Sequence, residues 1–437
     1  MVGVWVLNMI LQYFSKILFS ICLILFLSVF KDSSHVLADK IIINSGKSVI
    51  GFGSCNDQAY SQKFWDVIKS YNPDVFIMTG DNVYPKSSGS NLDELEYAYN
   101  SLKKSSHFKD FKNQIPLIAI WDDHDFGLSH GDEDHAFKIR SKKLFLDFFE
   151  IDEDDDRNIH DGLYKEYILF YKNKKLQILI LDTRFFKSEF LVTDEWGQKG
   201  KERYIPDVDD SKTILGQDQW LWLKDKMKKK VDLRVIVSSF QVLATDHGWD
   251  KWGNFPLEQE RLYSQINNSK AVKTIIISGD RHIGGIYSRN FHDVQLLEIT
   301  SSSLNNPLHF LVNENDAHQV GDIVTQTNFG LIKIDLLTRV SFEILTIIEP
   351  SIIHFLFDLH FFLNSFKKIS SSITLTLDNN SLLFEAIIEV FSGVIIKSLF
   401  SFIQLSTIFK TLFKFSFIFF PELTCKQETL NIYFVSP

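Results

Sequence analysis

Short, continuous apolar runs alternate along the chain with longer stretches in which apolar residues recur every three or four positions. Continuous runs are typical of strands buried on both faces, and the second spacing is typical of amphipathic helices. The predicted strands cover residues 49–55, 76–81, 117–123, 164–171, 176–182, 233–240, 275–280, 293–300, 328–336 and 340–346; the predicted helices cover residues 57–71, 92–108, 136–150, 217–230 and a segment ending at residue 270. This alternation predicts an α/β fold built of βαβ units, in which the last three strands complete a second sheet with antiparallel character.

Three of the predicted strands end in aspartates that are candidate metal ligands. Asp81 ends the run from residue 76, Asp123 follows the run from residue 117, and Asp280 ends the run from residue 275. Because α/β sheets bind ligands beyond the carboxyl ends of their parallel strands, we expect these carboxylates to meet in one cleft. Carboxylates brought together would repel one another unless metal cations lay between them. The strand ends therefore predict a metal-dependent hydrolase.

Cys55 and Tyr84 narrow the choice of metal. Cys55 ends the strand predicted at residues 49–55, and Tyr84 comes three residues after Asp81. A thiolate and a phenolate suit a ferric ion better than magnesium, so these residues with Asp81 indicate iron. Taken singly, Cys55 could be a buried small hydrophobe, and Tyr84 could be an aromatic residue packed over the turn.

Other strand-end residues suit phosphate chemistry. His124 could face a bound phosphate, where it would stabilise charge or protonate a leaving group; the alternative is a core histidine. In an extended segment Asp280 shares a face with His282, so the two could hold metals together. Arg184 could clamp a phosphate oxygen through its guanidinium fork, or it could form a salt bridge with Asp182 or a neighbouring acid.

Two loops are candidates for the wall around such a site. Residues 185–213 are polar and irregular, and we interpret them as an active-site loop or lid. His247, Trp249 and Trp252 lie in a second loop. They could form a substrate wall, although aromatic packing within the loop is the more ordinary interpretation.

The composition of the chain is that of a globular protein. Of 437 residues, 45% are hydrophobic and 23% are charged, and the formal net charge is -9. This charge argues against nucleic acid or acidic lipid as partners unless a local patch or a bound metal supplies positive charge.

Residues 1–38 contain an uncharged apolar segment followed by small residues, which predicts a signal peptide or an uncleaved signal anchor. Either one directs the body to the secretory pathway, to be secreted or tethered to a membrane.

The C-terminal segment, residues 349–437, has a different character. It holds 16 of the 40 phenylalanines and no arginine or tryptophan. Charged residues interrupt each apolar run before it reaches the ~18–20 residues that a transmembrane helix needs. We interpret this tail either as a membrane-associated segment or as sequence that is not native coding sequence. The catalytic domain is expected over residues 39–348.

Six short motifs follow one another along the body. They are Gly53-Ser54-Cys55, Gly80-Asp81-Asn82-Val83-Tyr84, Trp121-Asp122-Asp123-His124-Asp125, Leu181-Asp182-Thr183-Arg184, Ser239-Phe240-Gln241 and Ser278-Gly279-Asp280-Arg281-His282. In this order they resemble the alkaline phosphatase D-like (PhoD-like) branch of the calcineurin-like metallophosphoesterases. The resemblance spans residues 47–348. A single Gly-Asp pair is a weak signal, whereas six motifs in order, including the cysteine, are specific.

The resemblance implies an α/β fold of the metallophosphoesterase type, an αββα four-layer sandwich, to which the Phe-rich tail is an atypical addition. It implies iron and calcium as cofactors, with the identity of the second metal left open. The implied metal ligands are Cys55, Asp81, Tyr84, Asp123, Asp280 and His282. His124 matches a histidine beside the phosphate that binds no metal, and Gln241 stands where many relatives outside this branch have a metal-binding histidine.

Together these observations predict metal-dependent hydrolysis of phosphate monoesters or diesters, in which a metal-bound hydroxide attacks phosphorus in line. His124 and Arg184 are expected to act on the phosphate-ester substrate. Two alternatives stay open: a phosphatase that forms an aspartyl phosphate and uses Asp123 and Asp125, and a non-catalytic surface protein that keeps the fold. No nucleic acid is expected as a partner. Any membrane association would involve the N-terminal segment or the tail.

Overall fold

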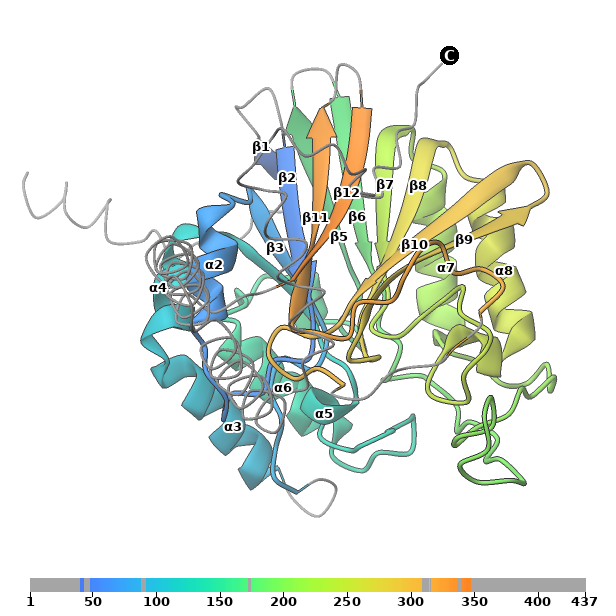
Figure 1. Cartoon of the computed structure of the whole chain (residues 1–437), viewed down its shortest axis with the longest axis horizontal. Coiled ribbons are helices and arrows are strands. Elements are labelled where there is room, and N and C mark those ends of the chain that lie inside the picture. Colours follow the sequence, from blue (N-terminus) through green and yellow to red (C-terminus); the bar gives the residue numbers. More distant parts are fainter. Residues whose placement is uncertain are drawn as a thin grey trace, which may run out of the picture. The chain divides into compact units, whose positions relative to one another are not determined.

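Two β-sheets lie face to face at the centre of the protein, and helices cover their outer faces (Figure 1). The computed structural model describes residues 40–42, 48–87, 92–171, 174–308, 314, 316–335 and 339–346. The predicted export signal at residues 1–38 and the Phe-rich tail at residues 349–437 lie outside this part of the chain, so both stay predictions. The αββα sandwich expected from the sequence is confirmed.

The five-stranded sheet has the order β12-β11-β2-β3-β4. Strands β2, β3 and β4 are parallel, whereas β11 is antiparallel to both of its neighbours. The bounds are β2 Ser48–Gly53, β3 Val75–Thr79, β4 Leu117–Ile120, β11 Asn328–Asp335 and β12 Arg339–Thr346. All five residues of β3 are buried, because this interior strand has helices on one face and the second sheet on the other.

The seven-stranded sheet has the order β1-β5-β6-β7-β8-β10-β9. Strands β6, β7, β8 and β10 are parallel, and β5 and β9 run antiparallel to β6 and β10. The bounds are β1 Lys40–Ile42, β5 Lys165–Tyr171, β6 Lys174–Ile180, β7 Val231–Val237, β8 Ala271–Ser278, β9 Gly284–Phe291 and β10 Val294–Ser301. Each sheet therefore has three or more parallel strands whose carboxyl ends point to one edge.

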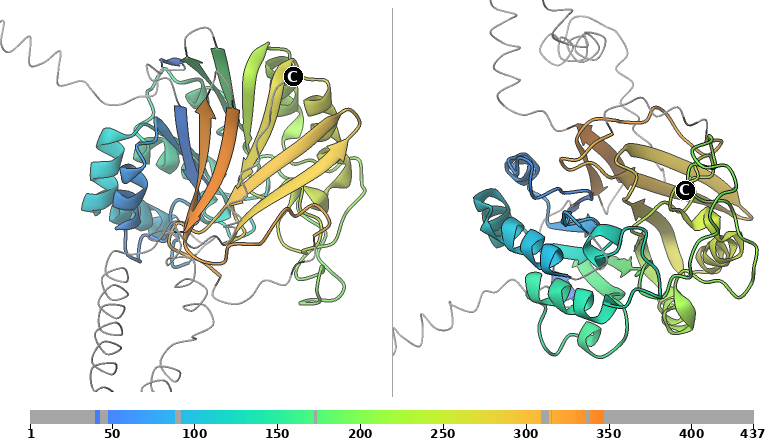
Figure 2. Two further views of the ribbon diagram at one scale, coloured as in Figure 1. Left: turned by 45° about the horizontal axis from the view of Figure 1, so that its top comes forward. Right: turned by 90° about the horizontal axis from the view of Figure 1, so that it is seen from below.

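The helices form the two outer layers, as the views in Figure 2 show. Helices α2, α3, α4 and α6 cover the five-stranded sheet, and α7 and α8 cover the seven-stranded sheet. The bounds are α2 Phe64–Ser70, α3 Asp93–Lys104, α4 Ser106–Gln114, α5 Asp123–Phe126, α6 Lys138–Phe148, α7 Gly216–Met227 and α8 Pro256–Asn267, with 3₁₀ turns η1 Asp156–Asn158 and η2 Trp252–Asn254. None of the helices in the described part of the chain combines the length and the apolar character that a membrane span requires.

Aromatic packing fixes the first helical layer to its sheet. The Trp65 ring of α2 lies with its centroid 5.5 Å from that of Phe76 in β3. The same indole packs against Phe108 and Phe111 of α4, at 5.3 Å and 4.7 Å. Tilted and edge-on contacts of this kind add to the stabilisation that burial gives. They hold two helices and the strand that leads to Asp81 as one unit.

The predicted helix at residues 92–108 is two helices instead of one. The chain turns at Ser105, whose backbone is extended between α3 and α4. The Ser105 hydroxyl accepts a hydrogen bond from the Phe108 main-chain N–H at 3.4 Å, so it caps the second helix. The helix predicted at residues 57–71 begins only at Phe64, because residues 54–63 form the loop that leaves Cys55.

The assignment of the last strands to sheets was partly wrong. Strand β10 joins the seven-stranded sheet, but β11 and β12 return to the five-stranded sheet beside β2. Strand β9, which pairs with β10, was not expected from the apolar pattern. Periodicity identifies a buried strand but not the edge to which it adds, since an edge is chosen by long-range pairing.

Gly330 of β11 lies directly opposite Phe52 of β2, and the phenyl ring covers it. A Cβ at position 330 would lie 2.2 Å from two carbons of that ring. The pairing therefore requires a residue without a side chain opposite the aromatic ring.

We predict that Gly330→Ala lowers the free energy of unfolding by about 1–3 kcal/mol, because the added methyl group forces the buried ring from its position. Urea denaturation of the wild type, Gly330→Ala, Phe52→Leu and the double variant measures this. The smaller side chain of Phe52→Leu should relieve the clash, so the double variant should lose less stability than the two single losses added together. Strict additivity would contradict this packing account.

Candidate metal centre

The carboxyl ends of strands from both sheets meet at one edge of the sandwich. Cys55 follows β2, Asp81 follows β3, and Asp123 begins the short helix α5 after β4. Asp280 and His282 follow β8 of the other sheet. Because parallel strands bring their carboxyl ends to one edge, residues far apart in the sequence converge there.

The backbone is strained at four of these positions. Cys55, Asp81, Asp280 and His282 have φ angles of 59°, 48°, 67° and 54°. Residues with a side chain rarely adopt this left-handed region, at a cost of about 1–3 kcal/mol each, and such strain gathers at functional sites. The turns thus aim four side chains inward at the expense of local stability.

The potential ligand atoms form three overlapping groups, and within each group all of these atoms lie within 4.8 Å of one another. The groups are Cys55, Asp81 and His282; Asp81, Asp123 and His124; and Asp81, Asp122, Asp123 and Asp280. Asp81 belongs to all three and is buried. An arrangement of carboxylate oxygens with a sulfur and imidazole nitrogens is a donor set for cations.

The side chains of Tyr84 and Cys55 both lie beside the same oxygen of Asp81. Its hydroxyl donates a hydrogen bond to Asp81 Oδ2 at 2.9 Å and lies 3.4 Å from His282 Nε2. Cys55 Sγ lies 3.7 Å from the same Asp81 oxygen. The six metal ligands implied by the sequence therefore lie in one cluster in the structure.

His282 and Cys55 favour their charged forms together. His282 Nδ1 contacts the main-chain carbonyl of Asn306, which leaves Nε2 toward the cluster. Burial raises the pKa of the Cys55 thiol, but the charge of His282 and hydrogen bonds with His282, Ser302 and Tyr84 outweigh it and lower the pKa to about 7. Burial lowers the pKa of His282, but Cys55 and the Asn306 carbonyl raise it to about 9. A thiolate is the form of cysteine that binds metal.

Burial and neighbouring charges shift the pKa values of the carboxylates in the rest of the cluster. Burial, followed by the charges of neighbouring acids, raises the pKa of Asp81 and of Asp280 well above the usual range. Burial also acts to raise the pKa of Asp123, but the charges of His124 and Arg184 lower it to about 2. A cation between the carboxylates would relieve the repulsion that raises the first two values.

Asp125 holds the turns after β3 and β4 together. Its Oδ1 accepts hydrogen bonds from the main-chain N–H groups of Asp122 and Asp81, at 2.6 Å and 3.2 Å. Its Oδ2 accepts from the main-chain N–H and the side-chain amide of Asn82. Both oxygens are thus occupied by the turn that presents Asp81.

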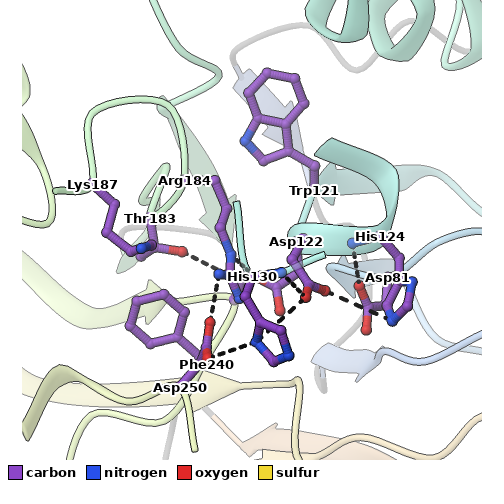
Figure 3. Close-up of polar contacts among 12 residues, drawn as sticks. Asp81, Trp121, Asp122, His124, His130, Thr183, Arg184, Lys187, Phe240 and Asp250 are labelled. Atoms are coloured by element: carbon purple, nitrogen blue, oxygen red, sulfur yellow. Dashed lines mark hydrogen bonds and ion pairs between the residues drawn. The ribbon is translucent and has the colours of Figure 1, made fainter. Parts of the chain in front are cut away.

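Arg184 is fully buried and forms the ion pair that the sequence left as the alternative. Figure 3 shows its guanidinium between two acids: Nε donates to Asp122 Oδ1 and Nη1 to Asp250 Oδ2, each at 2.6 Å. The Asp182 carboxylate accepts a hydrogen bond from the main-chain N–H of Arg184, at 2.9 Å, and is not paired with the guanidinium. That Arg184 also clamps a phosphate oxygen stays a prediction.

Two atoms of this pair lack partners. Asp122 Oδ2 and Arg184 Nη2 are buried and form no hydrogen bond within the described part of the chain. Buried polar atoms are nearly always satisfied, so each such atom needs an explanation. Asp122 Oδ2 belongs to a carboxylate that lies with three others around a common point, and a cation there would satisfy it. The residues present therefore fit a metal ion.

His124 is the partly exposed imidazole of the cluster. Its ring centroid lies 4.2 Å from that of Tyr84, and its main-chain N–H donates to Asp81 Oδ1 at 3.3 Å. The side chain is 30% exposed, whereas that of Asp123 is 5% exposed. It is therefore placed where a molecule from solvent can contact it, and it is not a core histidine.

Three residues at the site were not found from the sequence. Asp122 was left unassigned within the run of acids after Trp121, although its position directly after β4 was a usable signal. His130 donates its main-chain N–H to Asp123 Oδ2 at 2.6 Å, and its Nδ1 lies 3.0 Å from Asp250 Oδ1. His130 and Asp250 are single residues in loops, and no pattern of the chain distinguishes them.

The substrate wall suggested for the second loop is wrong for two of its three residues. Trp252 and His247 are buried, and His247 Nε2 lies 3.0 Å from Gln241 Oε1. Gln241 also donates to Thr300 Oγ1 at 2.9 Å, so its amide is held within the protein. Packing within the loop, the more ordinary interpretation, accounts for these residues; only Trp249 is exposed.

The family model of the PhoD-like phosphatases matches residues 50–330. The chain belongs to the PhoD-like phosphatase family. Its structure resembles a solved structure of PhoD with a TM-score of 0.53 and 14% sequence identity, over 69% of this chain and 66% of PhoD. The match thus spans slightly less than two thirds of the PhoD chain.

Two other solved structures match with lower TM-scores. GAP50, the anchor in the inner membrane complex of Plasmodium, gives a TM-score of 0.44 at 11% identity, over 69% of this chain and 84% of GAP50. Purple acid phosphatase PPD1 from yellow lupin (Lupinus luteus) seeds gives 0.45 at 8% identity, over 70% of this chain and 52% of PPD1. A comparison with curated protein sequences gave no match.

In this PhoD-like chain we predict that Arg184→Met lowers the free energy of unfolding by about 3–5 kcal/mol, because two buried carboxylates lose their counter-charge. Urea denaturation in excess chelator measures the loss without a contribution from metals. Arg140→Met removes an exposed arginine that pairs with Asp93 and Glu96, and it should cost less than about 1 kcal/mol. Equal losses for the two variants would contradict the role given to Arg184.

Proposed function

We propose that this protein hydrolyses phosphate esters with the help of metal ions held at the strand-end cluster. The observation that carries the proposal is the group of four carboxylates, Asp81, Asp122, Asp123 and Asp280, whose oxygens lie within 4.8 Å of one another. Membership of the PhoD-like phosphatases supports the reaction class. Whether monoesters or diesters are preferred depends on the loops around the cluster.

The donor types divide the cluster into two sides. Cys55, Tyr84 and His282, with Asp81, would hold iron, because thiolate and phenolate suit a ferric ion. The remaining carboxylates of the four-acid group, Asp122, Asp123 and Asp280, would hold a second cation together with Asp81, and calcium suits these oxygen donors. Bound cations supply Lewis-acid stabilisation of the phosphoryl oxygens and make water a better nucleophile near neutral pH.

The chain's own residues position and protonate the substrate. Hydrolysis joins the oxygen of water to phosphorus and breaks the bond between phosphorus and the leaving oxygen, which then takes up a proton. His124, which is partly exposed beside Asp81, can donate a hydrogen bond to the phosphate or the proton to the leaving oxygen. The Arg184 guanidinium holds Asp122 through the ion pair with Asp122 Oδ1, so the acid cluster keeps its geometry when substrate enters.

The aspartyl-phosphate alternative requires Asp125 to act as an acid next to Asp123. Both oxygens of Asp125 instead accept hydrogen bonds from the turns that present Asp81 and Asp122. This geometry favours direct attack by water over a covalent intermediate. The second alternative, a surface protein that binds without turnover, has no structural observation in its favour.

We predict that the full-length protein hydrolyses 4-nitrophenyl phosphate and that chelation abolishes this activity. Cys55→Ala should lose iron, because it removes the sulfur ligand that the described part of the chain brings to the cluster. Metal analysis and turnover on the same preparations measure both effects, and Cys425→Ala, which removes another cysteine, serves as the control. Full activity of the metal-stripped protein would refute the proposal, and bound iron without hydrolysis of any phosphate ester would favour the binding protein.

We further predict that His124→Ala lowers kcat about 10²–10⁴-fold while the metal content stays that of the wild type, because the imidazole contacts substrate and not metal. Initial rates with metal analysis measure this. His107→Ala, which removes an exposed histidine paired with Asp66, should leave kcat unchanged. Loss of metal from His124→Ala would instead assign the imidazole as a ligand.

A further inference from the structure

A row of contacting side chains leads from the metal centre to the protein surface. It begins at Asp123, which accepts the main-chain N–H of His130 at 2.6 Å. The His130 ring packs edge-on against Tyr204, with 6.0 Å between the centroids. The Tyr204 hydroxyl accepts a hydrogen bond from Arg203 Nε at 2.9 Å, and the Arg203 guanidinium lies 5.2 Å above the ring of Trp196. The outer residues are thus connected to the cluster through His130 and Tyr204 and do not belong to the ligand groups.

Arg203 differs from the other cations of its loop. Lys201 pairs with Asp194 and Glu195, at 3.0 Å and 3.3 Å, and Lys199 lies 3.5 Å from Asp246. Within the described part of the chain Arg203 forms no ion pair; its polar partner is the neutral hydroxyl of Tyr204. In a protein with a net charge of -9, a scarcity of carboxylates does not explain this.

The backbone that carries Arg203 is fixed by hydrogen bonds to two neighbouring segments. The main-chain N–H groups of Arg203 and Tyr204 both donate to the carbonyl of Gly248, at 3.2 Å and 2.8 Å. The Arg203 carbonyl accepts from the Thr193 N–H at 2.9 Å. A Cβ on Gly248 would lie 2.4 Å from the main-chain nitrogen of Glu202, so this close approach requires glycine. Preorganisation of this kind lowers the entropic cost of binding a ligand.

We infer that Arg203 and Trp196 bind the leaving group of the substrate and that this leaving group carries a second anionic group. The inference rests on the proposed function, since the scissile phosphate is placed at the metal cluster. The guanidinium offers N–H donors in a planar fork that suits a carboxylate or a second phosphate. Trp196, which is 63% exposed, offers a flat apolar face to the part of the leaving group between its two charges.

The test compares aryl phosphates that share one ring and differ in the para substituent of the leaving group, with kcat/KM expressed per phosphate group. Phenyl phosphate is neutral there, 4-carboxyphenyl phosphate carries a carboxylate, and 1,4-phenylene bisphosphate carries a second phosphate. We expect kcat/KM of the wild-type, metal-loaded protein to be about fivefold higher for the charged substrates, the order of one partly exposed charge-assisted hydrogen bond. The two charged substrates separate a carboxylate preference from a phosphate preference. Higher ionic strength should reduce the advantage of both.

Variants of the loop assign that preference to one residue. Arg203→Gln should bring the ratio of kcat/KM between charged and neutral substrates to about one, and Arg203→Lys should keep part of it because the charge remains. Lys201→Gln removes a cation of the same loop that is already paired, and it should leave the ratio as in the wild type. If Arg203→Gln does not fold, Arg203→Lys and the salt dependence of the wild type still show whether Arg203 causes the preference for charged substrates.

The inference and the proposed function fail in different ways. Hydrolysis of all three substrates with equal kcat/KM would overturn the inference and leave the proposed function standing. A charge preference that survives in Arg203→Gln would also overturn it. Absence of hydrolysis for every substrate in the metal-loaded protein would instead refute the proposed function.

Discussion

Mutual repulsion among buried carboxylates is the constraint on which the structure of the site depends. Asp81, Asp122, Asp123 and Asp280 come from turns of both sheets and lie within 4.8 Å through their oxygens. Burial and neighbouring charge raise the pKa of two of them, Asp81 and Asp280, well above the usual range. A fold that brings such groups together loses stability unless positive charge is supplied, and metal ions are the compact source of it.

The chain supplies part of that positive charge itself. Arg184 pairs with Asp122 and Asp250, and Asp250 in turn contacts His130. These residues come from three loops that follow β4, β6 and β7, so the buried guanidinium connects turns of both sheets. Asp125 connects the backbone in a similar way, because its two oxygens accept hydrogen bonds from the turns after β3 and β4. The geometry of the acids is therefore fixed by neighbours that would not themselves hold metal.

Much of this was open to prediction from the sequence. Asp81, Asp123 and Asp280 follow continuous apolar runs, and parallel strands must end at one edge, so their convergence follows from local pattern and simple topology. The return of β11 to β2 could not be predicted, because pairing at a sheet edge is a long-range choice. The role inferred for Arg203 could not be predicted either. It depends on the absence of a carboxylate partner near the guanidinium in the described part of the chain, and the sequence does not show which residues lie near one another in the fold.

The most direct test of the account is the melting temperature of Asp280→Asn and the wild type, each measured in chelator and again with iron and calcium. Neutralising Asp280 removes repulsion from the metal-free cluster, so in chelator the variant should melt at a higher temperature than the wild type. Metals at a hundredfold excess over the dissociation constant should stabilise the wild type by about 2.7 kcal/mol and the variant far less. With metals present, the wild type should therefore melt at a higher temperature than the variant. A variant that melts below the wild type in chelator, or a wild type whose melting temperature metals do not raise, would contradict the account.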